Sequence, residues 1–281
     1  MNLPKTTTVC IEEGLYTITK DPFNKRIRVD DYYGNINRIV RTVEKVAEDE
    51  QYEKIIIKAR QEDLVLFLSI GYVLEGMVDH YFLGNHMYFL CKFLQSERRN
   101  SDMWHEEDEL LENILSSKLI DSKQSSHMYS LVNCMENHAE QLADLYRTVF
   151  KVYPVPMNNP MYIKKCMREG SVFLAYEHDG KMISAVSAEV NQRYRNAEIT
   201  DCATLPDYRK FKLMQFLITM LEDELHSRRI YCLYSIARAN SYGMNAVFHR
   251  LHYQYRGRLA NNCYIFEDIE DMNVWVKYLT R

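Results

Sequence analysis

From residue 172 onward the chain shows a regular succession of strand and helix patterns. Apolar segments at 172–176 and 183–190 flank Asp179-Gly180, a dipeptide that favours a tight hairpin turn. The elements that follow are strands at 197–204 and 231–236, helices at 213–225 and 244–251, and extended sequence again from Tyr253. Strands that alternate with helices in this way predict an α/β fold, of the α+β kind with a mixed sheet, for the C-terminal half.

The residues before this hairpin carry one strand pattern and two helix patterns. Residues 129–134 are apolar and extended, and residues 138–150 place Leu142, Leu145 and Tyr146 on one helical face. A shorter helix at 161–168 is closed by Gly170.

The N-terminal half begins its recognisable pattern at residue 35. The predicted elements are a helix at 35–51, a buried strand at 55–57, a helix at 63–70, and a hairpin of 72–79 and 86–93 around Gly84-Asn85. Residues 97–124 are rich in charge and serine and carry one possible helix at 107–115. We expect the connection between two domains in this segment.

Length and charge limit the classes of protein to which the chain can belong. Its 281 residues suit two small domains, and 47% hydrophobic residues with only 9 Gly and 6 Pro indicate a folded chain. A net charge of −4 gives no signature of binding to nucleic acid or to an anionic membrane. Small-molecule chemistry is therefore favoured.

The cysteines and the N-terminus bear on metal binding and location. The seven cysteines are scattered without a Cys-x-x-Cys pair, and no histidine cluster has ligand spacing, so no metal is expected. The first 13 residues lack a signal-peptide pattern, and no apolar run reaches the roughly 18 residues that span a bilayer. We expect a cytoplasmic protein, and the sequence leaves its oligomeric state open.

The segment from Ala197 to Met214 resembles the strand, loop and helix start that bind acetyl-CoA in GNAT acetyltransferases. In that family an Arg/Gln-x-x-Gly-x-Gly/Ala loop directs backbone N–H groups at the pyrophosphate, beside a helix N-terminus. Arg209 matches the first position, whereas Lys212 and Met214 stand at the two small-residue positions and Lys210 where glycine is also common. The lysines either bind the phosphates or are solvated at the helix start. The resemblance implies that acetyl-CoA contacts Thr204, Leu205, Arg209, Lys210, Phe211, Lys212, Leu213 and Met214.

Three longer strings are similar to the beta-lysine N-acetyltransferase family. They are Ile236-Ala-Arg-Ala-Asn-Ser-Tyr-Gly-Met-Asn245, Arg258-Leu-Ala-Asn-Asn-Cys-Tyr-Ile265 and Glu270-Asp-Met-Asn-Val-Trp-Val-Lys277. Membership would imply transfer of acetyl from acetyl-CoA to the ε-amine of (S)-β-lysine, which a 2,3-aminomutase makes from lysine. The product would be the compatible solute Nε-acetyl-β-lysine. The family usually has glycines in the phosphate loop and a glycine before Tyr253, where this chain has His252.

An internal echo suggests that the N-terminal half is related to the C-terminal half. Lys58-Ala-Arg60, Phe67, Gly71-Tyr72 and Gly76 recur as Ile236-Ala-Arg238, Phe248, His252-Tyr253 and Gly257. We predict that residues 1–125 form a truncated GNAT-like domain without a phosphate loop, and that residues 126–281 form the GNAT acetyltransferase domain. The alternative is chance similarity between two amphipathic α/β segments.

Acetyl transfer to an amine requires a proton acceptor, because a lysine-type amine has a pKa of about 10.4. Glu198, in an Ala-Glu-Ile string like that which carries the base in histone-type GNAT enzymes, is the candidate. Alternatively it is a partly exposed strand residue, or binds an ammonium without taking its proton. Asp201, three residues on, should lie on the opposite strand face and pair with the second ammonium of the substrate.

Protonation of the departing thiolate is a task that many GNAT enzymes give to a tyrosine, but the matching position here is Phe248. Tyr242 is the substitute we expect, with Tyr234 as the other possibility, although either could be a core residue. Asn245 is expected to contact the CoA arm; its alternative is a polar helix residue.

The carboxylate of a β-amino acid calls for a guanidinium fork. Arg238 is the candidate, unless it forms a salt bridge to an acidic neighbour. Asn261 and Asn262 could add amide contacts to the substrate, or form a turn between strands. Rival functions are acetylation of another small amine or a protein lysine, and noncatalytic binding of acyl-CoA.

Overall fold

The computed structural model of the chain describes residues 3–119, 129–150, 154–265 and 268–280. Its strands are β1 (Lys5–Ile11), β2 (Gly14–Asp21), β3 (Arg26–Gly34), β4 (Lys54–Arg60), β5 (Val73–Phe82), β6 (Asn85–Phe93), β7 (Ser130–Cys134), β8 (Val172–His178), β9 (Lys181–Asn191), β10 (Asn196–Thr204), β11 (Cys232–Arg238), β12 (Gln254–Ile265) and β13 (Asp268–Tyr278). In the described ranges they form one sheet, in the order β1-β2-β3-β4-β6-β5-β12-β13-β11-β10-β9-β8-β7. The mixed α/β sheet predicted from the sequence is confirmed.

The helices lie close to their predicted positions, except for α3, which was not predicted. They are α1 (Ile36–Asp49), α2 (Leu64–Ser69), α3 (Ser96–Arg99), α4 (Trp104–Leu115), α5 (Ala139–Val149), α6 (Pro160–Arg168), α7 (Leu213–Ser227) and α8 (Tyr242–Arg250), with 3₁₀ turns η1 (Gln61–Asp63), η2 (Glu136–His138) and η3 (Pro206–Phe211). Within the described ranges, no helix combines the length and apolar character needed to cross a membrane.

The two halves of the sheet have the same strand order. The N-terminal half reads β2-β3-β4-β6-β5 and the C-terminal half reads β9-β10-β11-β13-β12. In each half one pair is parallel, β3 with β4 and β10 with β11, and a helix connects its two strands. The order predicted for the N-terminal half, a helix, a strand, a second helix and a hairpin, is therefore present in both halves. The boundary predicted at residues 125 and 126 lies outside the described residues, and the assignment of 1–125 as a truncated GNAT-like domain stays a prediction.

The strands before residue 35 were not predicted. β1 and β2 are rich in threonine, and most of β1 is exposed, so periodic apolar burial is weak there. β3 pairs in parallel with β4 and buries Ile27 and Val29. α1 starts two residues after β3, and the side chain of its N-cap residue Asn35 accepts a hydrogen bond from the N–H of Arg38. The N-terminal half thus has no counterpart of η3 among its described residues.

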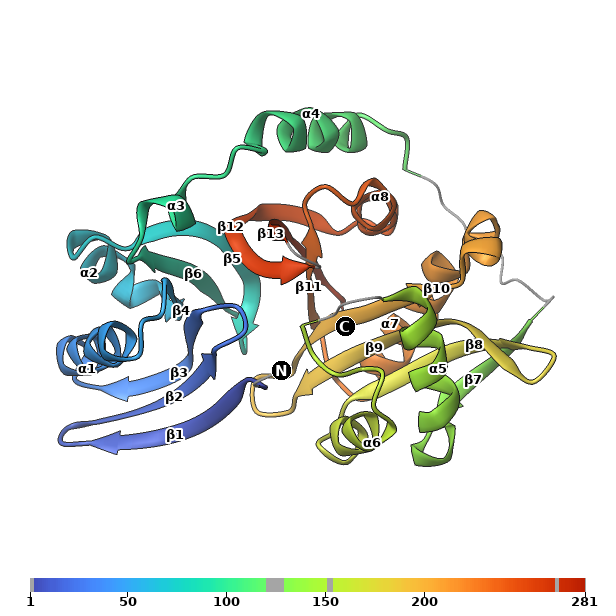
Figure 1. Cartoon of the computed structure of the whole chain (residues 1–281), viewed down its shortest axis with the longest axis horizontal. Coiled ribbons are helices and arrows are strands. Elements are labelled where there is room, and N and C mark those ends of the chain that lie inside the picture. Colours follow the sequence, from blue (N-terminus) through green and yellow to red (C-terminus); the bar gives the residue numbers. More distant parts are fainter. Residues whose placement is uncertain (1–2, 120–128, 151–153, 266–267, 281) are drawn as a thin grey trace.

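The two halves join along β5 and β12, at the centre of the view in Figure 1. Next to this junction Lys54 Nζ lies 2.6 Å from Glu75 Oε2 and donates to the carbonyl of Ala260, with all three groups buried. A separate apolar cluster contains side chains from both halves, among them Ile56, Val78, Phe89, Tyr234, Leu259 and Val276. The halves therefore share a core.

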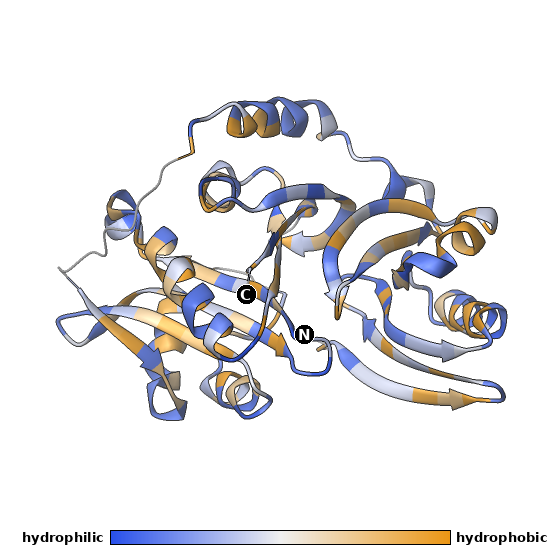
Figure 2. Cartoon of the chain, turned by 180° about the vertical axis from the view of Figure 1, so that it is seen from behind, coloured by the Kyte–Doolittle hydropathy of each residue, from blue (hydrophilic) through white to orange (hydrophobic). Residues whose placement is uncertain are grey.

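Helix α4 crosses from one half to the other above α8 (Figure 1) and is largely hydrophilic, as Figure 2 shows. It is attached through Arg258, whose guanidinium lies 3.5 Å from the carboxylate of Glu107 and 2.8 Å from that of Asp108. The predicted connecting helix at 107–115 is thus packed against the C-terminal half.

Candidate active site

A cavity of about 1260 Å³ opens between the two halves of the molecule. Its C-terminal wall comes from α6, β9, β10, the start of α7, the end of β11 and α8. Its N-terminal wall includes Thr19, Arg28, Ile56 and Lys58, from β2, β3 and β4. The contribution of the N-terminal half was not anticipated from the sequence.

Two glutamates face each other in this cavity. Glu198 on β10 is paired with Glu189 on β9, and both line the cavity. Removal from bulk solvent, followed by the charges of Glu198 and Asp201, raises the pKa of Glu189 to about 7, although its side chain is exposed to the cavity. Glu189 is therefore poised to exchange a proton near neutral pH. The sequence analysis missed it, yet β9 and β10 are joined by a short turn, which makes these two positions partners.

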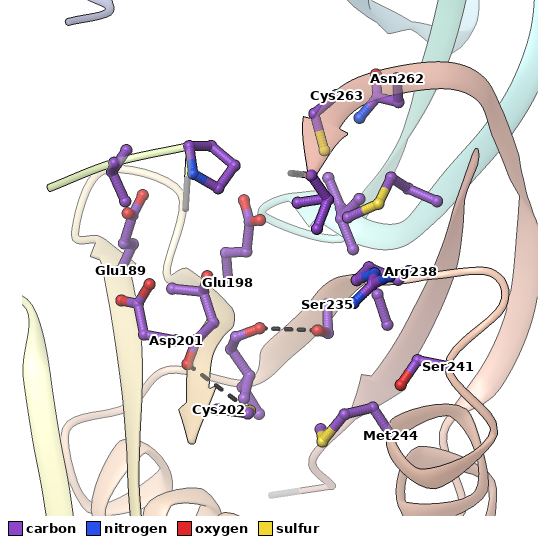
Figure 3. A pocket seen from close by; sticks show the side chains of 18 of the residues that line it. Glu189, Glu198, Asp201, Cys202, Ser235, Arg238, Ser241, Met244, Asn262 and Cys263 are labelled. Atoms are coloured by element: carbon purple, nitrogen blue, oxygen red, sulfur yellow. Dashed lines mark hydrogen bonds between the residues drawn. The ribbon is translucent and has the colours of Figure 1, made fainter. Parts of the chain in front are cut away.

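Asp201 does not lie on the opposite side from Glu198, as strand alternation predicted. The register of β9 and β10 shifts between Thr200 and Ala203, and Asp201 itself has a left-handed φ of 50°. This bulge turns Asp201 into the same cavity, where Ser187 Oγ donates to its Oδ2 at 2.5 Å. Figure 3 shows the carboxylates of Glu189, Glu198 and Asp201 gathered on one side. The alternation argument was wrong because it assumed an unbroken strand.

The N-terminal wall carries a cationic cluster around one carboxylate. Asp30 accepts from Arg28 Nε at 2.6 Å and from Thr19 Oγ1 at 2.6 Å, and Lys58 Nζ lies 3.1 Å away. Burial would raise the pKa of Asp30, but the charges of Arg28 and Lys58 and the Thr19 hydrogen bond outweigh it and hold that pKa below its ordinary value. Asp30 is therefore ionised, and the two cations share it.

The predicted acetyl-CoA segment reaches the cavity at the start of α7. Lys212, between η3 and α7, has a left-handed φ of 56°, which explains why glycine suits this position. The first N–H groups of α7 have no carbonyl partner within the helix, so the positive end of its dipole meets the cavity. Of the predicted segment, the residues lining the cavity are Thr204, Arg209, Lys212, Leu213 and Met214.

Three residues of the predicted segment do not line the cavity. The N–H of Leu205 donates to the carbonyl of Ile183 at 2.9 Å, so this donor is already used. Phe211 packs against Tyr129 and Tyr208, and Lys210 Nζ lies over its ring. The hypothesis that Lys210 binds phosphate therefore has no support in the position of its side chain.

Asn245 does not point toward a CoA arm. It is fully buried, and its Nδ2 donates to the carbonyls of Arg238 and Ser241, both at 2.8 Å. Its Oδ1 accepts from Asn273 Nδ2 and Trp275 Nε1. All of its hydrogen-bonding capacity is used to attach the start of α8 to β13, so the cofactor role predicted for it is wrong.

Arg238 lines the cavity, but its guanidinium fork is occupied. Nε and Nη2 donate to the two carboxylate oxygens of Glu270, each at 2.6 Å. This is the salt bridge that the sequence analysis left open as the alternative to binding a substrate carboxylate.

Asn261 and Asn262 lie inside β12, not in a turn between strands. Asn261 does not line the cavity, because its Nδ2 donates to the carbonyls of Glu97 and Asn100. Asn262 does line it, and its buried Oδ1 has no hydrogen-bond partner among the described residues. The predicted pair of substrate amides is thus reduced to Asn262.

Tyr242 is 49% exposed and does not line the cavity, so the geometry does not support it as the proton donor. Tyr234 is paired in register with Glu198 but is buried and does not line the cavity, and burial, followed by the charge of Glu198, raises its pKa well above the ordinary value. Of the tyrosines in the described residues, Tyr162 on α6 is the one that lines the cavity.

The chain is similar in sequence to known acetyltransferases. The model of the Acetyltransferase (GNAT) family matches residues 139–253, from α5 to the residue that precedes β12. N-acetyltransferase YodP of Bacillus subtilis is 41% identical over 92% of this chain and 94% of that protein. Two proteins named beta-lysine N(6)-acetyltransferase are also similar. The one from Methanococcus maripaludis is 30% identical over 90% of this chain and 93% of its own length, and the one from Methanosarcina mazei is 32% identical over 89% and 100%.

Proposed function

Because the chain belongs to the beta-lysine N-acetyltransferase family of GNAT enzymes and is thus an acetyl-CoA-dependent N-acetyltransferase, we propose that its acceptor is the ε-amine of (S)-β-lysine. Under this proposal the product is the zwitterion Nε-acetyl-β-lysine, with the role of a compatible solute. The predicted cytoplasmic location is part of the same proposal.

The observation that carries the proposal is the group of three carboxylates at the bulge of β10, in the cavity that the start of α7 also lines. Such a cluster attracts ammonium groups, and the N-terminus of α7 attracts the phosphates of acetyl-CoA. The two substrates would then meet at the end of β10. Holding them in line can supply roughly 7 to 11 kcal/mol of the barrier reduction.

Glu198 and Glu189 take up the proton of the attacking amine under this proposal, directly or through one water. A base whose pKa lies near the working pH is the most effective, and the raised pKa of Glu189 suits that role. Asp201, oriented by Ser187, holds the second ammonium. Arg209 and Lys212 add charge beside the phosphates, while the backbone of Leu213 and Met214 supplies the N–H donors.

The test is product identification with the purified chain, acetyl-CoA and a panel of acceptors. The panel contains β-lysine, lysine, cadaverine and a lysine-containing peptide, and mass spectrometry locates the acetyl group. We expect the highest kcat/KM for β-lysine, with acetylation at the ε-nitrogen. A tenfold or greater preference for cadaverine would mean that the acceptor is a plain diamine and not β-lysine. Preference for the peptide would support acetylation of a protein lysine.

A further inference from the structure

We propose that Arg28, on β3 of the N-terminal half, binds the carboxylate of the amino-acid acceptor. This inference rests on the proposed function in one respect: the acceptor is an amine that also carries a carboxylate. It moves carboxylate recognition from Arg238, where the sequence analysis placed it, to the opposite wall of the cavity.

Arg28 and Glu198 have matching positions in the two halves of the sheet. Glu198 stands between Glu189 on one neighbouring strand and Tyr234 on the other. Arg28 stands in the same way between Thr19 and Ile56.

The echo of Lys58-Ala-Arg60 with Ile236-Ala-Arg238 places Ile56 and Tyr234 at equivalent positions. The pairing register also shifts shortly after each of these two residues. On β3 the shift is at Asp30, two residues after Arg28, and on β10 it lies beyond Thr200, two residues after Glu198. Arg28 is therefore the counterpart of Glu198, and both line the cavity between the halves. Equivalent positions in the two halves thus carry opposite charges.

The guanidinium of Arg28 has hydrogen-bond donors that no described residue uses. Arg28 uses Nε to bind Asp30, and its two Nη groups have no hydrogen-bond partner among the described residues. They form the end-on pair of a guanidinium, which matches the two oxygens of a carboxylate. The Nε and Nη2 groups of Arg238 already donate to Glu270. Arg26 donates to Asp21 and to the carbonyl of Asn262. Arg28 is therefore better able than Arg238 or Arg26 to bind a substrate carboxylate with two parallel hydrogen bonds.

The charge around Arg28 differs from that on the facing wall of the cavity. On the N-terminal wall one carboxylate, Asp30, is shared by Arg28 and Lys58, which leaves one positive charge in excess. Lys58 is nearly buried and also donates to Tyr81, so it helps to hold the cluster in place and offers little to a ligand.

The facing wall carries Glu189, Glu198 and Asp201. A molecule with a carboxylate at one end and ammonium groups beyond it complements both walls. A plain diamine would leave the two Nη groups of Arg28 without a carboxylate partner.

The experiment compares β-lysine with 1,4-diaminopentane, which has the same two amines and lacks only the carboxylate. The variant is Arg28→Met, which keeps the aliphatic stem and leaves Asp30 paired with Thr19 and Lys58. We expect kcat/KM for β-lysine to fall by about 10- to 100-fold, mainly through KM, because a charge-assisted hydrogen bond is lost. The value for 1,4-diaminopentane should stay within about threefold, and Arg28→Lys should restore part of the loss.

Arg238→Ala is the matched comparison, because Arg238 lines the same cavity. We expect it to affect both acceptors alike. The Tm and the acetyl-CoA affinity of Arg28→Met are the controls. We expect both to equal the wild-type values, which would show that the fold and the cofactor site of the variant are intact. An equal loss on both acceptors for Arg28→Met, or a carboxylate-selective loss for Arg238→Ala, would overturn the assignment.

The outcomes also separate this inference from the proposed function. If the wild type acetylates lysine in preference to β-lysine, and Arg28→Met loses lysine but retains cadaverine, the role of Arg28 stands and the proposed acceptor is wrong. If β-lysine is the acceptor and the variant shows no selectivity, only the role of Arg28 is wrong. Calorimetry and mass spectrometry show whether the wild type binds or acetylates any amine that carries a carboxylate. If it does neither, both the proposed acceptor and the role of Arg28 are wrong.

Discussion

Gly76 on β5 and Gly257 on β12 lie directly opposite each other where the two halves of the sheet meet. They are the equivalent glycines of the internal echo, so each half brings the same position to the junction. A Cβ on Gly257 would overlap the backbone carbonyl of Glu75 and the Cα of Gly76, and Gly257 has a φ of 126°. The close approach of β5 and β12 therefore requires glycine here.

We predict that Gly257→Ala lowers the free energy of unfolding by about 2 to 4 kcal/mol, since both the overlap with backbone and the left-handed φ oppose a side chain. Urea unfolding followed by circular dichroism measures the change. Gly243→Ala on α8 is the control, because nothing lies within 4 Å of a Cβ there, and it should be neutral or stabilising. Equal stability of the two variants would show that the junction tolerates a wider spacing.

Lys212→Gly should preserve binding of acetyl-CoA. The residue adopts a left-handed conformation that glycine takes without strain, and the backbone donors at the start of α7 remain. The lost lysine charge is worth at most about 1 kcal/mol at an exposed site, so calorimetry should give a Kd within about fivefold of the wild type. A collapse of binding on Lys212→Gly with no effect of Arg209→Ala would mean that the lysine charge, not the main chain, holds the phosphates.

The rate of acetylation should rise with pH through about 7, because the raised pKa of Glu189 delays formation of the unprotonated base. Glu198→Gln removes one of the negative charges that raise this pKa, so the acidic limb of kcat/KM should move to lower pH. The same variant should lower kcat by about 10²-fold without abolishing turnover, since Glu189 remains.

Glu169→Gln is the control for this pH profile, because Glu169 lines the same cavity but is paired with Lys165. The acidic limb of its kcat/KM profile should coincide with that of the wild type. Wild-type kcat and an unmoved limb in Glu198→Gln would remove Glu198 from the mechanism.

The attachment of α4 should weaken as pH rises. Burial, followed by the charge of Asp271 and the hydrogen bond between the two carboxyls, raises the pKa of Glu107 to about 8. The stabilisation that this raised pKa gives is complete below the ordinary carboxyl range and is lost as pH rises through about 8. Glu107→Gln cannot ionise, so its Tm relative to the wild type should increase between pH 6 and pH 9.

Glu109→Gln, on the exposed side of α4, serves as the control for that measurement and should show no such trend. A Tm difference between Glu107→Gln and wild type that stays constant over this range would indicate that Glu107 is ionised throughout.

Local patterns were sufficient to predict most of the regular elements. The Asp179-Gly180 turn, the apolar face of α1 and the helix α7 depend on residues close to one another in the chain, and all three are present. Periodicity failed where burial is one-sided and partial, as in β1, or where a bulge interrupts alternation, as at Asp201. Glu189 could have been found from its position across a short turn from Glu198.

Sequence patterns were enough to identify the family, the succession of strands and helices, and the position of Glu198 on the strand that leads to α7. The residues that face Glu198 across the cavity depend on the tertiary structure. Arg28 lies 170 positions earlier in the chain, and it reaches the cavity because β5 and β12 join the two halves. Tertiary packing also buries Asn245 among backbone carbonyls and pairs the guanidinium of Arg238 with the carboxylate of Glu270. Propensity and periodicity act over a few residues, whereas the choice of partners across a cavity depends on strand register and on contacts between distant segments.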